Sequence, residues 1–367
     1  MLGHVRSLPI LVLAASLAVA ACSAVDGSAG VDEARRTELA ARWRLYLTND
    51  AAWPDAREAW FSGPRDEREL LLDNLTIELL RDDAAGRGVA TASRSARARR
   101  ELQWFGGEAV PLLVEGMKGL ALRERIDHVA LDRLALALVE LHAAAELAAL
   151  VTDAKAAETS VALRLAGIRA LAPADEPAVV EALTAALRSD PAWEVRGAAA
   201  EALRRRAANG PARAALVAAF ADSDGYVRAQ AVRALAVGLD PETDGAALRS
   251  VRGMLLADPA PQARGAAAEA LALYAFDPEA GAALVRALRD PDSSVVARSA
   301  RALQNVRTGA VQLALVDALE SAIQRRDDGL VSELLLILTA SVGARPADIN
   351  PVGWRALVRQ RDDSLGR

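Results

Sequence analysis

Few side chains in this 367-residue chain are of the types that catalyse reactions or bind metals. There is one cysteine, Cys22, and two of the three histidines, His128 and His142, lie in the body of the chain. The sequence has no Gly-x-Ser-x-Gly nucleophile elbow and no phosphate-binding loop, and the cysteine is not available as a nucleophile. We therefore predict a protein that is not an enzyme, with no metal and no cofactor, although a metal site built only from carboxylates stays open.

Cys22 has neighbours that indicate a covalent modification. An apolar run of 14 residues, Leu8–Ala21, follows Arg6 and is too short to span a bilayer, which is typical of a secretory signal. Its end, Val19-Ala20-Ala21 before the cysteine, resembles the lipobox of bacterial lipoproteins. The resemblance implies cleavage before Cys22, a diacylglyceryl thioether on its sulfur and a further acyl chain on its new amine.

Lipidation of this kind would fix where the protein resides. Two or more acyl chains anchor a protein stably to a membrane, whereas a single chain does so only marginally. Ser23 stands where an aspartate would retain a lipoprotein at the inner membrane, so the resemblance implies the outer membrane, facing the periplasm. Ordinary signal cleavage that leaves a free thiol, or an uncleaved anchor, are the alternatives.

The charge balance bears on the partners of the processed chain. Loss of residues 1–21 removes one arginine and no acid, leaving 43 basic and 49 acidic residues and a net charge of −6. Nucleic acid is therefore an improbable partner, because its phosphates attract basic surfaces. Residues 22–32 read as a Gly/Ser/Ala tether with a reach of roughly 15 to 20 Å.

The body of the chain has a helical composition and an internal repeat. Hydrophobic residues make up 52% but aromatic residues only 4%, which favours helices rich in alanine and leucine. An Ala-Leu pair recurs with leucines 32, 32, 36 and 32 residues apart. These leucines are Leu171, Leu203, Leu235, Leu271 and Leu303. Together with a second helix-period segment before each turn, the repeat predicts stacked pairs of antiparallel helices.

An acid precedes each of these helices at one equivalent place: Glu158, Asp190, Asp222, Asp258 and Asp290. Proline follows three of them, so we predict that the acid is the N-cap and that the proline is the first helical residue. The segments Asp290–Val295 and Val195–Leu203 carry the pattern best. They resemble the bacterial HEAT-like repeat of the phycobilisome-lyase type, whose signature is Asp-Pro-Asp-x-x-Val-Arg followed by Ala-Ala-x-x-Ala-Leu.

The resemblance implies a right-handed all-α solenoid, a stack of helix pairs around one continuous core. It also implies that the arginines after Val or its equivalent in each repeat bond the turn acids and form the framework of the stack; they are Arg164, Arg196, Arg228 and Arg264. Val296 interrupts this series, which puts the last such bond in doubt. A second row alternates in charge, and we expect an ion-pair ladder along it, through Arg169, Glu201, Arg233, Glu269 and Arg301.

The two ends of the chain do not follow the repeat, and solenoids need atypical ends. Residues 33–105 hold four of the six tryptophans, and we interpret them as a helical cap, with an aromatic docking patch as the alternative. The basic run Arg94–Arg100 is either a patch for anionic headgroups or a solvated helix face. Residues 106–325 form the predicted repeat array, and residues 326–367, with Trp354, the C-terminal cap.

Two aromatic residues stand in turns that otherwise carry small or polar residues. Trp193 and Tyr226 lie one position apart in the repeat alignment, and packed helices are separated by roughly 8 to 10 Å. We therefore predict one aromatic spot that binds a partner, the alternative being that each ring folds back over its own helix.

Taken together, these patterns predict a monomeric, non-enzymatic scaffold for an unidentified protein partner, anchored by lipid at Cys22 to a bacterial envelope membrane. A structural or assembly lipoprotein of an envelope machine is one alternative. A HEAT-repeat enzyme of the lyase-like type is the other, although the repeat alone does not transfer an activity.

Overall fold

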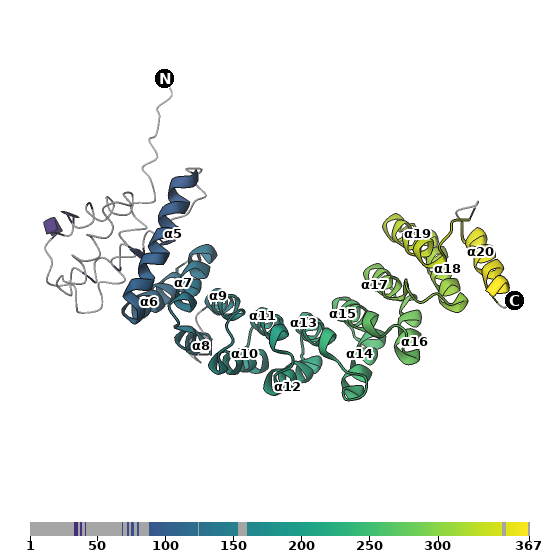
Figure 1. Cartoon of the computed structure of the whole chain (residues 1–367), viewed down its shortest axis with the longest axis horizontal. Helices are drawn as coiled ribbons and strands as arrows, with labels where there is room; N and C mark the ends of the chain where they lie inside the picture. The colour runs from purple at the N-terminus through teal and green to yellow at the C-terminus, as the bar shows by residue number, and fades with distance from the viewer. Residues whose placement is uncertain are drawn as a thin grey trace, which may run out of the picture. The chain divides into compact units, whose positions relative to one another are not determined.

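The structure is a computed structural model that describes residues 33–35, 37–38, 41, 68, 72, 75–76, 79–80, 88–123, 125–152, 160–346 and 350–365. Within these ranges the chain is helical and contains no strand (Figure 1). No helix among them combines the length and the apolar character needed to cross a membrane. The predicted signal segment, Cys22 and the tether lie outside the described residues.

The chain divides into two compact units, Met1–Ala182 and Leu183–Arg367. In the first unit α7 packs on both α6 and α9, and α8 packs on α9. The helix α10 contains the boundary between the units. The helices up to that point are α5 (Gly88–Phe105), η3 (Gly106–Glu108), α6 (Val110–Ala121), α7 (His128–Glu140), α8 (Ala144–Thr152), α9 (Val161–Leu171) and α10 (Pro177–Ser189).

The second unit repeats one helix pair. Its helices are α11 (Trp193–Leu203), η5 (Arg204–Arg206), α12 (Gly210–Ala218), η6 (Ala219–Ala221), α13 (Gly225–Leu235), η7 (Ala236–Gly238), α14 (Gly245–Ala257), α15 (Pro261–Leu271), η8 (Ala272–Tyr274), α16 (Pro278–Ala287), α17 (Ser293–Leu303), α18 (Gly309–Gln324), α19 (Asp328–Val342) and α20 (Pro351–Leu365). Helices α11, α13, α15 and α17 pack side by side as one layer, and α12, α14 and α16 each pack against the next helix of that layer (Figure 1). This arrangement is the predicted all-α solenoid.

The repeated leucines lie in the core, as their period predicts. Leu203, Leu235, Leu271 and Leu303 are each 0% exposed, and the alanines on the same helices let neighbouring helices approach closely. Full burial of one leucine contributes up to about 3 kcal/mol. Each helix pair buries its apolar stripe against the neighbouring pairs, so the stack rather than the single repeat is the stable unit.

The predicted N-caps are wrong by two residues. Helix α13 begins at Gly225, and its N-cap is Asp224, whose carboxylate accepts from the backbone N–H of Tyr226. Asp222 lies before that cap and closes the preceding turn instead. The prolines that follow the acids, such as Pro191 and Pro259, also lie in the turn and not at the first helical position. An aspartate two residues before the N-cap can accept from a turn N–H just as the cap residue accepts from a helix N–H, so the sequence alone does not separate the two positions.

Helices α5 and α20 each bury one aromatic side chain. Trp354 of α20, in the segment interpreted as the C-terminal cap, is 1% exposed, and α20 packs on α18. In α5, Phe105 is buried and Arg99 forms an ion pair with Glu140 of α7 at 3.3 Å, so this part of the basic run faces protein. Trp104 is 57% exposed. The other tryptophans of the predicted N-terminal cap lie outside the described residues.

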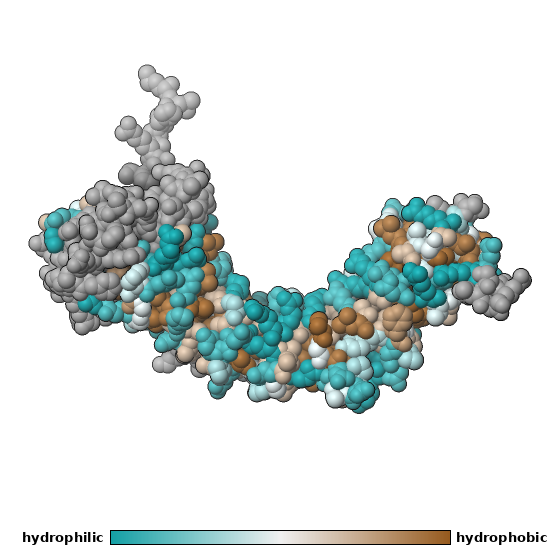
Figure 2. All heavy atoms as spheres, viewed as in Figure 1, coloured by the Kyte–Doolittle hydropathy of each residue, from teal (hydrophilic) through white to brown (hydrophobic). Residues whose placement is uncertain are grey.

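The surface of the second unit is largely hydrophilic, with hydrophobic side chains gathered locally, as over α15 (Figure 2). Both histidines of the body are exposed; His128 begins α7, whereas His142 lies in a turn with a positive φ of 58°. No group of three or more His, Cys, Asp or Glu side chains within the described ranges is placed to hold a metal ion.

Candidate protein-interaction surface

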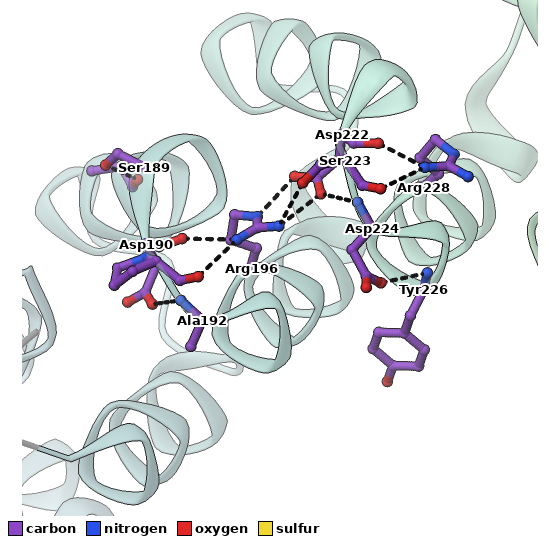
Figure 3. Close-up of polar contacts among 11 residues, drawn as sticks. Ser189, Asp190, Ala192, Arg196, Asp222, Ser223, Asp224, Tyr226 and Arg228 are labelled. Atoms are coloured by element: carbon purple, nitrogen blue, oxygen red, sulfur yellow. Dashed lines mark hydrogen bonds and ion pairs between the residues drawn. The ribbon is translucent and has the colours of Figure 1, made fainter. Parts of the chain in front are cut away.

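The turns that precede α11, α13, α15 and α17 share one local geometry, which Figure 3 shows for the first two. In the turn before α13, the Asp222 carboxylate accepts from the backbone N–H of Asp224 at 2.8 Å. The same bond, from the residue two positions later to the carboxylate, occurs at Asp190 at 2.9 Å, at Asp258 at 2.9 Å and at Asp290 at 2.8 Å. This bond orients the second carboxylate oxygen toward the preceding repeat.

An arginine from the preceding repeat donates hydrogen bonds to both oxygens of this carboxylate. Arg196 of α11 donates from Nε and Nη2 to the two carboxylate oxygens of Asp222, each at 2.8 Å (Figure 3). Its remaining terminal nitrogen donates to backbone carbonyls of its own turn, those of Asp190 at 3.0 Å and Pro191 at 3.2 Å. One guanidinium thus ties the turn before its own helix to the turn of the next repeat.

Two further junctions repeat this arrangement. Arg228 donates to Asp258 at 2.7 and 2.6 Å and to the carbonyl of Asp222 at 2.7 Å. Arg264 donates to Asp290 at 2.7 and 2.8 Å and to the carbonyl of Asp258 at 2.8 Å. The sequence predicts that these arginines bond turn acids, and the structure adds that each acid belongs to the following turn. Arg164, the remaining arginine of the series and the first along the chain, is buried in α9.

The electrostatics of these links follow from their geometry. Burial alone would raise the pKa of Asp222, but the hydrogen bonds from Arg196 and from the N–H of Asp224 outweigh burial and lower the pKa below its ordinary value. The same balance lowers the pKa of Asp258, with Arg228 as its donor. The carboxylates raise the pKa of the three arginines in turn, against the opposing effect of burial. All these groups are therefore ionised across the physiological range.

This arrangement leaves the Arg and Asp side chains little capacity for other chemistry. The side chains of the Arg228–Asp258 pair are only 11% and 7% exposed, and those of Arg264–Asp290 are 12% and 8% exposed. Their hydrogen-bonding groups are occupied by each other and by turn backbone. They therefore hold neighbouring repeats in register and do not present a reactive group to a substrate.

The last junction of the series is different, because Val296 stands where the arginine would be. Val296 is 0% exposed, and the hydroxyl of Ser293 donates to Asp327 in place of a guanidinium. Asp327 also caps α19 by accepting from the N–H of Leu330 at 3.0 Å. Arg325, from the following repeat, reaches back to the carbonyl of Pro291 at 3.5 Å.

The predicted charge ladder is not continuous. Arg233 does pair with Glu269 at 3.0 Å, but the second partner of Glu269 is Arg298, at 2.7 Å, and not Arg301. Arg301 pairs with Glu333 instead. The helices are offset along their axes, so a residue one helical turn earlier is the nearer partner across the junction. Arg169 pairs with Asp132 of α7 at 2.6 Å.

Trp193 and Tyr226 lie together, as the repeat alignment predicts. Their ring centroids are 5.4 Å apart with an interplanar angle of 77°, an edge-to-face contact between the first turns of α11 and α13. Trp193 is 44% exposed, and Tyr226 is partly exposed. The two rings form an aromatic pair on the surface, beside the Asp222 turn.

A glycine in α11, which is not among the site residues expected from the sequence, makes room for this pair. A Cβ atom at Gly197 would lie 2.5 and 2.7 Å from two ring carbons of Tyr226, so the ring rests against the bare backbone of α11. Gly265, at the equivalent place in α15, likewise accommodates Arg298. Glycine inside a helix costs roughly 1 kcal/mol relative to alanine, and this cost was the signal available in the sequence.

The stacked helix pairs and their shared turns define a repeat protein of the α-solenoid class. Residues 147–236 and 248–337 match the family described as HEAT repeats. The chain is accordingly a HEAT-like repeat protein, and repeats of this family suggest a scaffold for protein interaction. Comparison with curated proteins finds no match.

Three solved structures are similar to the chain at low identity. An engineered protein is 16% identical, with a TM-score of 0.46, over 96% of this chain and 99% of its own. Human deoxyhypusine hydroxylase in complex with glycerol is 18% identical, with a TM-score of 0.25, over 63% of this chain and 94% of its own. A chain of the Pds5–Scc1 complex is 12% identical, with a TM-score of 0.36, over 99% of this chain and 65% of its own. Similarities at this level do not bear on function.

Proposed function

We propose that this protein is a non-enzymatic, monomeric scaffold that is tethered through a lipidated Cys22 to a bacterial envelope membrane and that captures a protein partner at the Trp193–Tyr226 pair. The tether leaves the repeats free to meet the partner near the membrane surface. Nucleic acid is not the expected partner of a chain with this net negative charge.

The aromatic pair is the observation that carries the binding part of the proposal. Tryptophan and tyrosine are rare in this chain, which has six Trp and three Tyr residues in all. Side chains of these types dominate binding hot spots, because a large rigid ring is buried at little cost in conformational entropy. The edge-to-face contact and the seat at Gly197 hold the Tyr226 ring in place before any partner arrives.

Co-purification from detergent-solubilised membranes tests the proposal. The double variant Trp193→Ala with Tyr226→Ala is expected to weaken partner capture at least tenfold, about 1.4 kcal/mol, with little change in the thermal midpoint. Val217→Ala and Leu256→Ala form the control, because these exposed apolar residues lie on α12 and α14. Unchanged capture by the aromatic variant, or its unfolding, would refute a binding role for the pair.

The anchor is tested separately by metabolic labelling with a fatty acid. The parent chain is expected to take up label and to be processed, whereas Cys22→Ala is expected to do neither. Equal labelling of both chains would exclude the lipoprotein interpretation. A partner that stays bound in constant stoichiometry through purification would instead favour the structural or assembly role in an envelope machine.

A further inference from the structure

The three helices after α17 are cross-linked to one another by polar side chains. Helix α18 packs on both α19 and α20. Gln312 of α18, which is 1% exposed, donates to the carbonyl of Ser341 in α19 at 3.0 Å. Arg355 of α20 donates to Asp317 of α18 at 2.8 Å, and Arg361 of α20 donates to the same carbonyl of Ser341 at 3.3 Å. Each helix is thus bonded to the other two, and we call α18, α19 and α20 the C-terminal body.

The helices before this body are joined by the three arginine links described above. Each of Arg196, Arg228 and Arg264 donates to both oxygens of an aspartate in the next repeat. Charge-assisted bonds of this kind are about twice as strong as neutral ones, and the paired geometry fixes their orientation. Rotation of one repeat against the next would break both carboxylate bonds at once, so the helices from α11 to α17 form a second unit, the arginine-linked body.

The junction between α17 and α19 lacks both partners of such a link. Val296 stands in place of the arginine. The linking aspartates lie two residues before the N-cap position of the next helix, but the residue two before Asp327, the N-cap of α19, is Arg325. Arg326, between them, has a φ of 57°, a region that residues other than glycine seldom adopt, and no residue of the three linked turns has a positive φ. Both the side chains and the backbone of this turn therefore differ from the linked ones.

The polar contacts that remain across this junction are few and weak. The hydroxyl of Ser293 donates to Asp327, and Arg325 donates to a backbone carbonyl of the turn before α17 only at 3.5 Å. Arg301 pairs with Glu333, but the arginine side chain is 62% exposed, so solvent screens the pair. The remaining contact between the two bodies is apolar, and apolar burial has no preferred direction. Rotation at this junction therefore breaks far fewer oriented bonds than rotation at a linked one.

A pocket of about 380 Å³ lies between the two bodies at the same junction. Val285 and Leu288, at the end of α16, line one side, and Ala314 and Ala318 of α18 line the other. The pocket between α14 and α16 is smaller, about 230 Å³, and those two helices also pack directly on one another. Protein interiors are close-packed, so space of this size lets α16 and α18 approach or separate without a clash of side chains.

The geometry points to a hinge at the last junction, about which the C-terminal body rotates against the arginine-linked body. The chain crosses this junction once, at residues 304–308 between α17 and α18. A hinge consists of a few loop or helix-end residues between two packed bodies, and this segment meets that description. Rotation changes the width of the pocket between α16 and α18, while the apolar contact between α17 and α19 stays buried.

Double electron–electron resonance between pairs of spin labels tests the hinge. The full chain is measured in detergent, with Cys22→Ala so that only introduced cysteines carry a label. The hinge pair is Leu273→Cys with Ala340→Cys, and the control pair is Arg205→Cys with Leu273→Cys. All three positions are exposed, each lies two residues after the core leucine of its helix, and each pair spans two junctions. Both junctions of the control pair carry an arginine link, whereas the hinge pair spans one linked junction and the last one.

The distance distribution of the hinge pair is expected to be at least twice as wide as that of the control pair. Ser293→Ala, which removes the hydroxyl bond to Asp327, should widen the hinge-pair distribution further and leave the control pair unchanged. Ser294→Ala is the matched control, because the hydroxyl of Ser294 bonds only within its own repeat, and it should change neither pair. Equal widths of the hinge and control pairs overturn the inference.

A further variant tests whether the arginine link is what stiffens a junction. Arg228→Gln removes the link between α13 and α15, inside the control pair, and should widen the control distribution at least 1.5-fold. Circular dichroism establishes that the variant is folded. A folded variant with an unchanged control distribution overturns the assigned cause of the hinge. If Arg228→Gln does not fold, the comparison of the two pairs in the parent chain decides the inference by itself.

Discussion

Two kinds of junction join successive repeats of the second unit. At the Arg228–Asp258 junction, and at the two others like it, a guanidinium joins two turns. Its Nε and one terminal nitrogen donate to the aspartate of the following turn, and its other terminal nitrogen donates to a backbone carbonyl of its own turn. At the final junction the guanidinium is missing, Val296 is fully buried in its place, and the hydroxyl of Ser293 bonds Asp327. The leucine core is the same on both sides of this change, since Leu271 and Leu303 are both 0% exposed.

The difference shows that the polar link and the apolar core contribute differently to the stack. Apolar burial stacks one repeat on the next at every junction, whichever polar residues are present. A bidentate arginine also fixes the relative orientation of two repeats, because its planar guanidinium donates two parallel hydrogen bonds to a carboxylate in one orientation only. Where Val296 removes the fork, the stack continues through the core, and a single hydroxyl bond closes the turn.

The largest expected effect tests whether the core is shared by both kinds of junction. Leu235→Ala, beside an arginine junction, and Leu303→Ala, at the valine junction, should each lower the free energy of unfolding by about 2 to 5 kcal/mol, because each leaves a cavity. Denaturant titration measures both. A loss at Leu303 much smaller than that at Leu235 would show that the final repeat is packed more loosely than its burial indicates.

A smaller effect separates the links themselves. Asp258→Ala leaves the nearly buried guanidinium of Arg228 without its partner and should cost about 3 kcal/mol. Asp327→Ala removes one hydroxyl bond and one cap bond, and should cost about 1 to 2 kcal/mol. The two variants are compared by urea midpoint with the slope held in common. Equal losses would mean that the arginine link adds no more than the serine link that replaces it.

The pH dependence of stability distinguishes the same residues. Hydrogen bonds from the arginines hold the pKa of Asp222 and Asp258 below the ordinary value, so their contribution is complete above about pH 4 and is lost as the pH falls through the folded-state pKa. The free energy of unfolding should therefore decline below about pH 4. Asp258→Asn should flatten that decline, as followed by circular dichroism in urea. An unchanged acid limb would contradict the assigned shift.

The smallest expected effect belongs to the row of alternating charges that includes Glu201, Arg233 and Glu269. The side chains of the Arg233–Glu269 pair are 34% and 42% exposed, and solvent screens such pairs. Glu269→Gln should cost under about 1 kcal/mol and should matter less in 0.5 M salt than in dilute buffer. Glu201→Ala, in the same row, should also cost under about 1 kcal/mol. A loss as large as that of Asp258→Ala would place this row in the framework.

The sequence by itself determined the helix pairs, their period and the leucines of the core, because helix propensity, turn residues and apolar spacing act over a few neighbouring positions. It also placed Trp193 and Tyr226 at adjacent turns, since the repeat carries every turn to one edge of the stack. The sequence did not separate an N-cap from the acid two residues before it, as Asp222 and Asp224 show.

Only the tertiary structure decided which partners meet across the junctions. Arg196 bonds Asp222 of the following turn, Glu269 reaches Arg298 before Arg301, and Tyr226 rests on the bare backbone at Gly197. These choices depend on the distance and the offset between packed helices. That spacing is set by the summed volumes of side chains from two repeats, a quantity that no local pattern in the sequence records.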